Sequence, residues 1–200
     1  IVFSEPDRTA PSRVFSGWGL APDDELSQEL ALRVTDPDED LAEELRRGNV
    51  VLGVVLTGGA PPAEKVRRKG GFANYGVNPR EIVHEYSGAV PSLPILQDAA
   101  KGNGAINAVP DRDAVVRRVP MILQAANDLY PSLVAEALRV GFGASTYLVK
   151  STGSQAYAFG SYRSFIRARA GVGEIGIGRL HVPTDPNAEM WLYDTGHRPE

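Results

Sequence analysis

The sequence predicts an α/β domain in which a mixed sheet is flanked by helices. Its 200 residues are 42% hydrophobic and 23% charged, as in an ordinary globular domain with an apolar core. A helix with clear start and stop signals lies directly before an apolar strand, which is the repeating unit of an α/β sheet. Short strand-like runs separated by turn residues follow this unit. We expect residues 1–200 to form a single domain.

The first helix and strand with strong signals are predicted within residues 38–56. Acidic residues occupy the first helical turn, Leu41 and Leu45 lie on one face, two arginines are in the last turn, and Gly48 ends the helix. Apolar and polar side chains do not alternate in residues 50–56, so this strand is expected to be buried on both faces.

The chain before this unit is predicted from its apolar positions. Ile1-Val2-Phe3 is a strand-like run without an initiator Met, and it breaks into the loop sequence Ser4-Glu5-Pro6-Asp7. We therefore expect the chain to begin inside a sheet. Residues 9–35 are expected to form a long loop that becomes helical, with Leu26, Leu30 and Val34 on one helix face.

The middle of the chain carries weaker signals. Residues 57–92 are rich in Gly and Pro and predict no certain element. The expected elements after them are a short helix at 91–100 that ends at Gly102 or Gly104, a strand at 105–109, a turn at 110–114, and a strand at 115–124 that completes a hairpin.

The C-terminal part alternates turn and cap signals with apolar runs. Asn127-Asp128 is a turn dipeptide, Tyr130 is expected in extended chain, and Ser132 caps a helix. That helix is expected to end at Gly141 and Gly143 and to carry an apolar stripe of Leu133, Ala137, Leu138 and Val140. Further strands are expected at 147–149, 174–177 and 189–193.

Composition excludes several classes of function. A net charge of −4 and a pI near 5.5 argue against a nucleic-acid-binding surface, although the basic residues 65–69 are a local exception. The absence of cysteine removes disulfides, thiolate catalysis and Cys-based zinc sites. The longest apolar run, residues 50–56, is far shorter than the roughly 20 residues of a membrane-spanning helix.

Motifs that suggest binding or catalysis lack the context they need. The sequence GVGEIGIG at 171–178 fits a dinucleotide fingerprint, but no helix follows it. Asp36, Asp38 and Asp40 have calcium-loop spacing, but the later positions of that loop are wrong, so they are expected to be acids of a helix N-terminus. The three histidines are isolated, and no G-x-S-x-G elbow occurs. We therefore predict no metal, no cofactor and no catalytic residue.

The most informative stretch is "VPDRDAVVRRVP" at 109–120. Asp111 and Asp113 are typical of a turn, and at least one of Arg117 and Arg118 must face the apolar side of the outgoing strand. An arginine held there needs a carboxylate partner, which the nearby acids or a ligand would supply. A paired hairpin is the favoured interpretation, and ligand contact is the alternative.

Five pieces of the chain resemble the CHASE2 domain, an extracytoplasmic sensory module of bacterial membrane receptors. In chain order they are "IVFSEPDR", "DEDLAEELRRGNVVLGVVL", "GAINAVPDRDAVVRRVPMIL", "YPSLVAEALR" and "RLHVPTDPNAEMWLYDTG". The third is the most specific.

The resemblance implies a membrane-anchored receptor. The full-length protein would have flanking transmembrane helices and a cytoplasmic nucleotide cyclase, diguanylate cyclase or histidine kinase as its output domain. The resemblance also implies that this chain lacks an N-terminal strand-helix segment, and that the receptor works as a homodimer. Its signal, a small molecule or a protein, is not defined by the family.

The expected ligand-binding residues follow from position and charge. Glu5 and Asp7 come at the carboxyl end of the expected first strand, where open α/β sheets place ligands, and Arg112, Arg117 and Arg118 are the candidate cations. Two alternatives to a sensor remain: a soluble α/β hydrolytic enzyme whose site forms only in the fold, and a module for protein–protein contacts.

Overall fold

The structure, a computed structural model, describes residues 2–10, 13–14, 17–18, 25, 29, 36–59, 66–152 and 171–193. In chain order the elements are α3 (Pro37–Arg47), β1 (Val51–Thr57), β2 (Gly71–Tyr75), the 3₁₀ turn η1 (Pro79–Glu81), β3 (Glu85–Tyr86), β4 (Gly88–Val90), α4 (Pro94–Ala99), β5 (Gly102–Ala105), β6 (Arg118–Pro120), β7 (Ile122–Ala125), β8 (Asp128–Pro131), α5 (Leu133–Gly141), β9 (Thr146–Thr152), β10 (Gly171–Ile177), β11 (Leu180–Pro183) and β12 (Glu189–Trp191).

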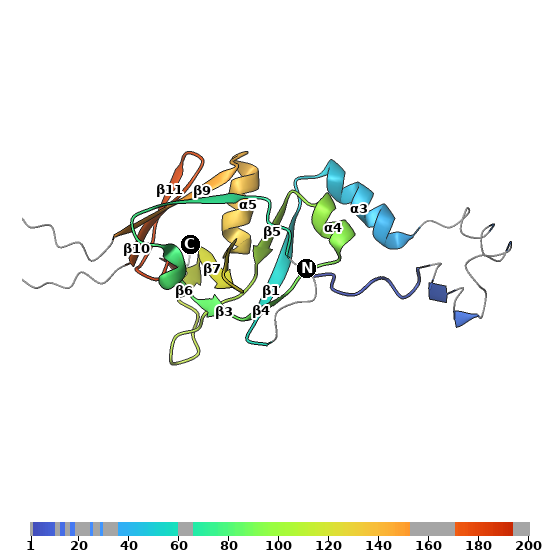
Figure 1. Ribbon diagram of the computed structural model, residues 1–200, viewed down its shortest axis with the longest axis horizontal. Coiled ribbons are helices and arrows are strands. Elements are labelled where there is room, and N and C mark those ends of the chain that lie inside the picture. The colour runs from blue at the N-terminus through green and yellow to red at the C-terminus, as the bar shows by residue number, and fades with distance from the viewer. Residues whose placement is uncertain are drawn as a thin grey trace, which may run out of the picture.

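The strands form mixed sheets, as the fold class predicted. β1 pairs in parallel with β5 and antiparallel with β4, and β9 pairs in parallel with β2 and antiparallel with β10. The other pairings among the described residues are β10 with β11, β12 with β6, and β7 with β3 and β8. Figure 1 shows α3 and α4 side by side near β1, and α5 between the β1–β5 pair and the β9–β10–β11 sheet.

Helix α3 and strand β1 confirm the strongest local prediction. The side chain of Asp36 caps the helix by accepting a hydrogen bond from the backbone N–H of Asp38, at 2.9 Å. Leu45 and Ala42 pack against Leu52 of β1 and Leu96 of α4. The helix is therefore held by an apolar face as well as by its cap.

The predicted hairpin of 105–109 with 115–124 is wrong. The turn exists, since the N–H of Ala114 donates to the carbonyl of Asp111 at 2.9 Å, but β6 pairs with β12 and β7 pairs with β8. The chain changes partner at Met121, whose N–H donates to the carbonyl of Ala188. Local alternation could not show this for β6, because its partner β12 is distant in sequence, whereas β8 follows β7 directly.

The glycines expected to end the helix at 91–100 instead lie in β5. A Cβ at Gly102 would lie 2.5 Å from Oε1 of Glu136, and a Cβ at Gly104 would lie 2.7 Å from Cα of Leu133. These glycines allow α5 to approach the strand closely. The helix α4 ends at Ala99, and the predicted strand at 105–109 begins three residues earlier, at Gly102, and ends at Ala105.

The remaining local predictions had mixed outcomes. The Ser132 cap, the end of α5 at Gly141 and the cores of β9, β10 and β12 are confirmed. The turn before β8 is also present, but it lies one residue earlier than predicted: Ala126 and Asn127 have positive φ, and Asp128 begins β8. Residues 57–92, for which no element was predicted, contain β2, η1, β3 and β4.

The predictions for the buried face of α5 and for the conformation of the N-terminal residues were wrong. The buried residues of α5 are Ala135, Glu136 and Arg139, whereas Ala137 of the predicted apolar stripe is exposed. The described N-terminal residues, 2–10, contain no strand, and Phe3 instead accepts a hydrogen bond from the N–H of Leu93 at 2.7 Å. Leu26, Leu30 and Val34 lie outside the described residues.

Candidate functional site

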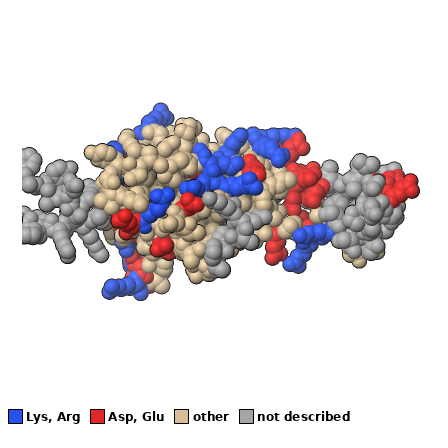
Figure 2. All heavy atoms as spheres, viewed as in Figure 1, with Lys and Arg blue, Asp and Glu red and all other residues tan. Residues whose placement is uncertain are grey.

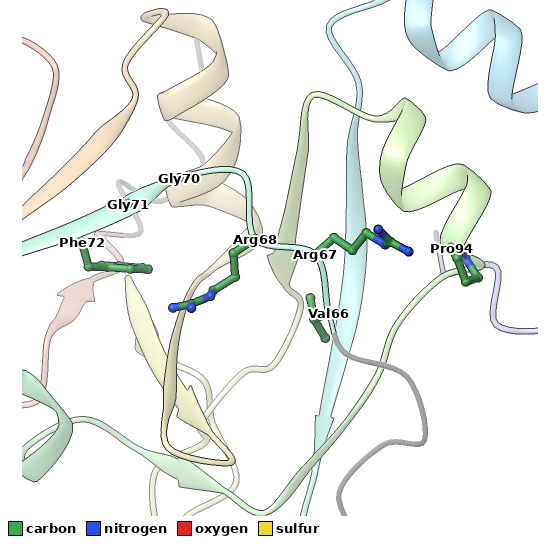
Figure 3. Close-up of a pocket in the computed structure, with 7 residues that line it drawn as sticks. All are labelled: Val66, Arg67, Arg68, Gly70, Gly71, Phe72 and Pro94. Carbon is green, nitrogen blue, oxygen red and sulfur yellow. The ribbon is translucent and has the colours of Figure 1, made fainter.

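A groove of about 700 Å³ opens along the segment that leads into β2 (Figure 3). We call it the 66–72 groove; its lining residues are Val66, Arg67, Arg68, Gly70, Gly71, Phe72 and Pro94. Its volume is in the range of small-molecule sites. The lining combines two guanidinium groups with apolar and backbone surface, which suits a ligand that is polar at one end.

Positive charge gathers around this groove. Lys and Arg side chains form a band across the centre of the face seen in Figure 2. Arg67 lies 3.2 Å from Asp98, and Arg68 lies 3.2 Å from Asp128. The amine of Lys69 donates to the backbone carbonyl of Asp98 at 3.0 Å, and a carbonyl is a neutral acceptor.

Buried amides fix the backbone of the groove. The side-chain oxygen of Gln97 accepts from the N–H of Arg67 at 2.9 Å, and the amide nitrogen of Asn103 donates to the carbonyl of Arg67 at 2.8 Å. Both amide side chains are almost wholly buried. The side chain of Arg67 therefore projects from a fixed backbone, which preorganises this part of the groove.

A buried ionic cluster lies directly beneath Gly70. Arg139 donates from Nε and Nη2 to the two carboxylate oxygens of Glu136, at 2.9 and 2.8 Å, and the hydroxyl of Tyr147 donates to Oε2. Burial, reinforced by the negative charge of Glu136, raises the pKa of Tyr147. A Cβ at Gly70 would lie 2.8 Å from Cδ of Arg139. Gly70, which lines the groove, therefore packs directly against this cluster.

A second ionic cluster, the 111–118 cluster, surrounds the two adjacent arginines of β6 and its preceding turn. Arg117 lies 2.8 Å from Asp113 and 3.1 Å from Asp111. Its hydrogen bonds lower the pKa of Asp113 to about 2. Arg118 pairs with Asp111, with Asp185 at 3.2 Å and with Glu189 at 3.3 Å.

Two further contacts complete the 111–118 cluster. The guanidinium of Arg118 lies 5.3 Å from the ring centroid of Trp191, within cation–π range. Nε2 of His84 lies 3.0 Å from Oε1 of Glu189, which is 2% exposed. Burial raises the pKa of Glu189, and the charges of His84 and Arg118 oppose that shift. The carboxylates of this chain therefore supply the partners that the sequence required for Arg118.

The described histidines are each paired with a glutamate. His84 pairs with Glu189, and Nδ1 of His181 lies 2.8 Å from Glu174. Within the described part of the chain neither ring is hydrogen-bonded to a serine hydroxyl, as nucleophilic catalysis would need. His197 lies outside the described residues.

The family model of the CHASE2 domain matches residues 1–198. The chain belongs to the CHASE2 domain family. CHASE2 domains are extracellular sensory domains of receptors rather than catalytic ones. No curated protein and no solved structure matches the chain at a significant level.

None of the helices among the described residues has the length and apolar character of a membrane-spanning helix. The same part of the chain holds no group of three or more His, Asp or Glu side chains placed to bind a metal ion.

The structure of this CHASE2 domain separates the residues expected to bind a ligand. Arg117 and Arg118 lie together in the 111–118 cluster, and Arg112 is exposed in the adjoining turn. Glu5 and Asp7 lie on exposed chain near α3, where the N–H of Asp7 donates to Asp38 at 3.0 Å. Figure 1 shows this N-terminal segment far from β6.

Most of the groove of this CHASE2 domain was not predicted from its sequence. The basic run at 65–69 was noticed as a local exception to the acidic composition, and it supplies Arg67 and Arg68. The buried pair of Glu136 and Arg139 had one available signal: two charged residues three positions apart on the strongly apolar helix α5.

Proposed function

We propose that this CHASE2 domain is the extracytoplasmic sensory part of a membrane-anchored receptor, and that a signal bound in the 66–72 groove controls a cytoplasmic output domain. The output domain would be a nucleotide cyclase, a diguanylate cyclase or a histidine kinase. The observation that carries this proposal is the family match over residues 1–198, because CHASE2 domains are sensory.

The surroundings of the groove support a sensing role. Arg67 pairs with Asp98 of α4, whereas Arg68 pairs with Asp128 at the start of β8. A ligand that competes for these guanidinium groups would change how the segment is tied to both elements. Such a ligand shifts the domain between two arrangements only if its affinity for them differs. In a homodimeric receptor this shift would reach the helices that enter the membrane.

The location is tested by fusing alkaline phosphatase, which is active only after export, to the domain within the full-length protein. We expect phosphatase activity, together with no fluorescence from the matching fusion to green fluorescent protein. Fluorescence without phosphatase activity would overturn the extracytoplasmic location.

The signalling role is tested in membranes that contain the full-length receptor. Cyclase and kinase activities are measured with and without small extracellular metabolites, in the parent protein and in an Arg68→Met variant. We expect a metabolite-dependent change of output that the variant loses and that an Arg46→Met control on the exposed face of α3 retains. An equal response in parent and Arg68→Met receptors would exclude the groove as the signal site.

A protein signal is the second candidate, and an exposed apolar surface favours it. Trp191, Leu192 and Tyr193 are 50%, 47% and 87% exposed at the end of β12. Val115 and Val116 are also exposed, and Leu192 is hydrogen-bonded to the carbonyl of the adjacent Arg117. Such a surface is typical of protein contacts. Loss of the receptor response in a Tyr193→Ser variant, with the Arg68→Met response intact, would favour this candidate.

A further inference from the structure

We propose that the 66–72 groove binds a small organic anion, whose carboxylate or phosphate group contacts Arg68 and whose apolar body lies against Phe72. This inference rests on the proposed function, in which the same groove is the signal site, and it adds the chemical class of the signal.

Among the described residues, positive charge is in excess at the groove. Three cations, Arg67, Arg68 and Lys69, lie in or beside it, and the carboxylates paired with them in this part of the chain are those of Asp98 and Asp128. Lys69 is hydrogen-bonded to a neutral carbonyl. An anion entering the groove would therefore meet a net positive charge, in a protein whose overall charge is −4.

Among the described residues, the guanidinium of Arg68 is paired with one carboxylate, that of Asp128. A guanidinium carries five N–H donors, and the ion pair of Arg68 with Asp128 is a contact at 3.2 Å between side chains that are 33% and 26% exposed. An ion pair this accessible to water holds its partners weakly. A carboxylate or phosphate can take two parallel N–H bonds from the same group, and these charge-assisted bonds are stronger than a single one.

Phe72 gives the groove an apolar wall. The ring of Phe72 is stacked on Tyr147, with 4.9 Å between their centroids, so its orientation is fixed by the core. In Figure 3 the side chains of Phe72 and Arg68 extend toward each other, while Arg67 extends toward Pro94. An anion on Arg68 thus has an apolar surface beside it, and an inorganic ion would leave that surface unused.

The experiment measures binding to the 200-residue chain by calorimetry at constant ionic strength. The probes are benzoate, phenyl phosphate, benzyl alcohol and inorganic phosphate, each at concentrations up to about 10 mM, which detects dissociation constants in the millimolar range. We expect benzoate, phenyl phosphate or both to bind at least tenfold more tightly than inorganic phosphate and benzyl alcohol. Benzoate alone would identify a carboxylate signal, and phenyl phosphate alone a phosphate signal.

Variants link that binding to the groove. Arg68→Met is expected to weaken it at least tenfold, and Phe72→Ala is expected to remove the preference over inorganic phosphate. Arg68→Lys, which retains a cation for Asp128, is expected to weaken it less than Arg68→Met does. Arg46→Met is the matched control, and circular dichroism checks that every variant is folded.

Three outcomes would overturn the inference. They are no binding of either aromatic anion, binding of benzyl alcohol as tight as that of benzoate, and equal affinities of parent and Arg68→Met chains. If the groove binds only benzyl alcohol, the signal is not an anion, but the groove can still be the sensory site. A receptor whose output is unchanged by Arg68→Met would reject the site itself.

Discussion

The hydroxyl of Tyr147 donates a hydrogen bond to the carboxylate of Glu136, and neither residue is exposed to solvent. Arg139 completes the cluster and also donates to the backbone carbonyls of Lys101 and Ala144, at 2.8 and 3.0 Å. The charges are therefore balanced and their hydrogen-bonding groups are largely satisfied inside the core. This cluster joins α5 to β9 beneath the 66–72 groove.

Removing the acid of this cluster should strongly destabilise the domain. A Glu136→Gln substitution leaves the guanidinium of Arg139 buried without a counter-charge, which costs about 3–5 kcal/mol when one partner of a buried pair is lost. Urea unfolding measures the change in the free energy of unfolding. Glu81→Gln, at an exposed position in η1, should leave it unchanged. A loss below about 1 kcal/mol for Glu136→Gln would show that the pair contributes little net stability.

Adding one methyl group where β5 packs against α5 should destabilise the domain. In Gly102→Ala the new Cβ would meet Glu136 at 2.5 Å, and overpacking of this kind costs about 1–3 kcal/mol. Gly141 in the last turn of α5 has no neighbouring atom within 4 Å of a Cβ, so Gly141→Ala should stabilise the domain by about 0.5–1 kcal/mol. Thermal unfolding of both variants checks these opposite signs, and a stable Gly102→Ala domain would contradict the close approach.

The side chain of Asn107 makes the hydrogen bonds that a neighbouring strand would make at the end of the β1–β5 pairing. Its amide accepts from the N–H of Leu56 and donates to the carbonyl of Leu56, both at 2.8 Å. Asn107→Asp keeps the acceptor and replaces the donor by a carboxylate that repels the carbonyl, so it should cost more than about 1 kcal/mol. Amide hydrogen exchange at Leu56 gives the readout. Slow exchange retained in both Asn107→Asp and Asn107→Ala would mean that the contact does not protect the strand.

Acid should weaken the 111–118 cluster in a defined pH range. The pKa of Asp113 is about 2 in the folded state, below the ordinary value of 3.8, because Arg117 donates hydrogen bonds to its carboxylate. Its stabilising contribution is therefore complete above the ordinary pKa and is lost as the pH falls through the folded value. NMR titration of the carboxyl carbon should show the pKa returning toward 3.8 in Arg117→Met and unchanged in Arg112→Met. A pKa of about 2 in the Arg117→Met chain would assign the shift to another cause.

Much of the local structure was predictable, because its signals lie within a few residues. The cap of α3 at Asp36, the cap of α5 at Ser132 and the turn before β8 each depend on neighbours in sequence. The family resemblance was also carried by short stretches, and the match over residues 1–198 confirms it.

The candidate site was less predictable. Arg117 and Arg118 were chosen because arginines near an apolar strand need acceptors, and the structure supplies those acceptors from Asp111 and from the distant Asp185 and Glu189. The groove brings the 66–72 segment beside Pro94, and no periodicity within either stretch predicts that proximity.

The sequence by itself determined α3, β1 and α5, because caps, turns and apolar periodicity act over one or two turns of chain. Only the tertiary structure decided that β6 pairs with β12, that Gly102 faces Glu136, and that a charged pair occupies the buried face of α5. The reason is physical: strand pairing and burial of charge depend on groups supplied by distant segments, and their free energies exceed the local preferences that a short stretch can express.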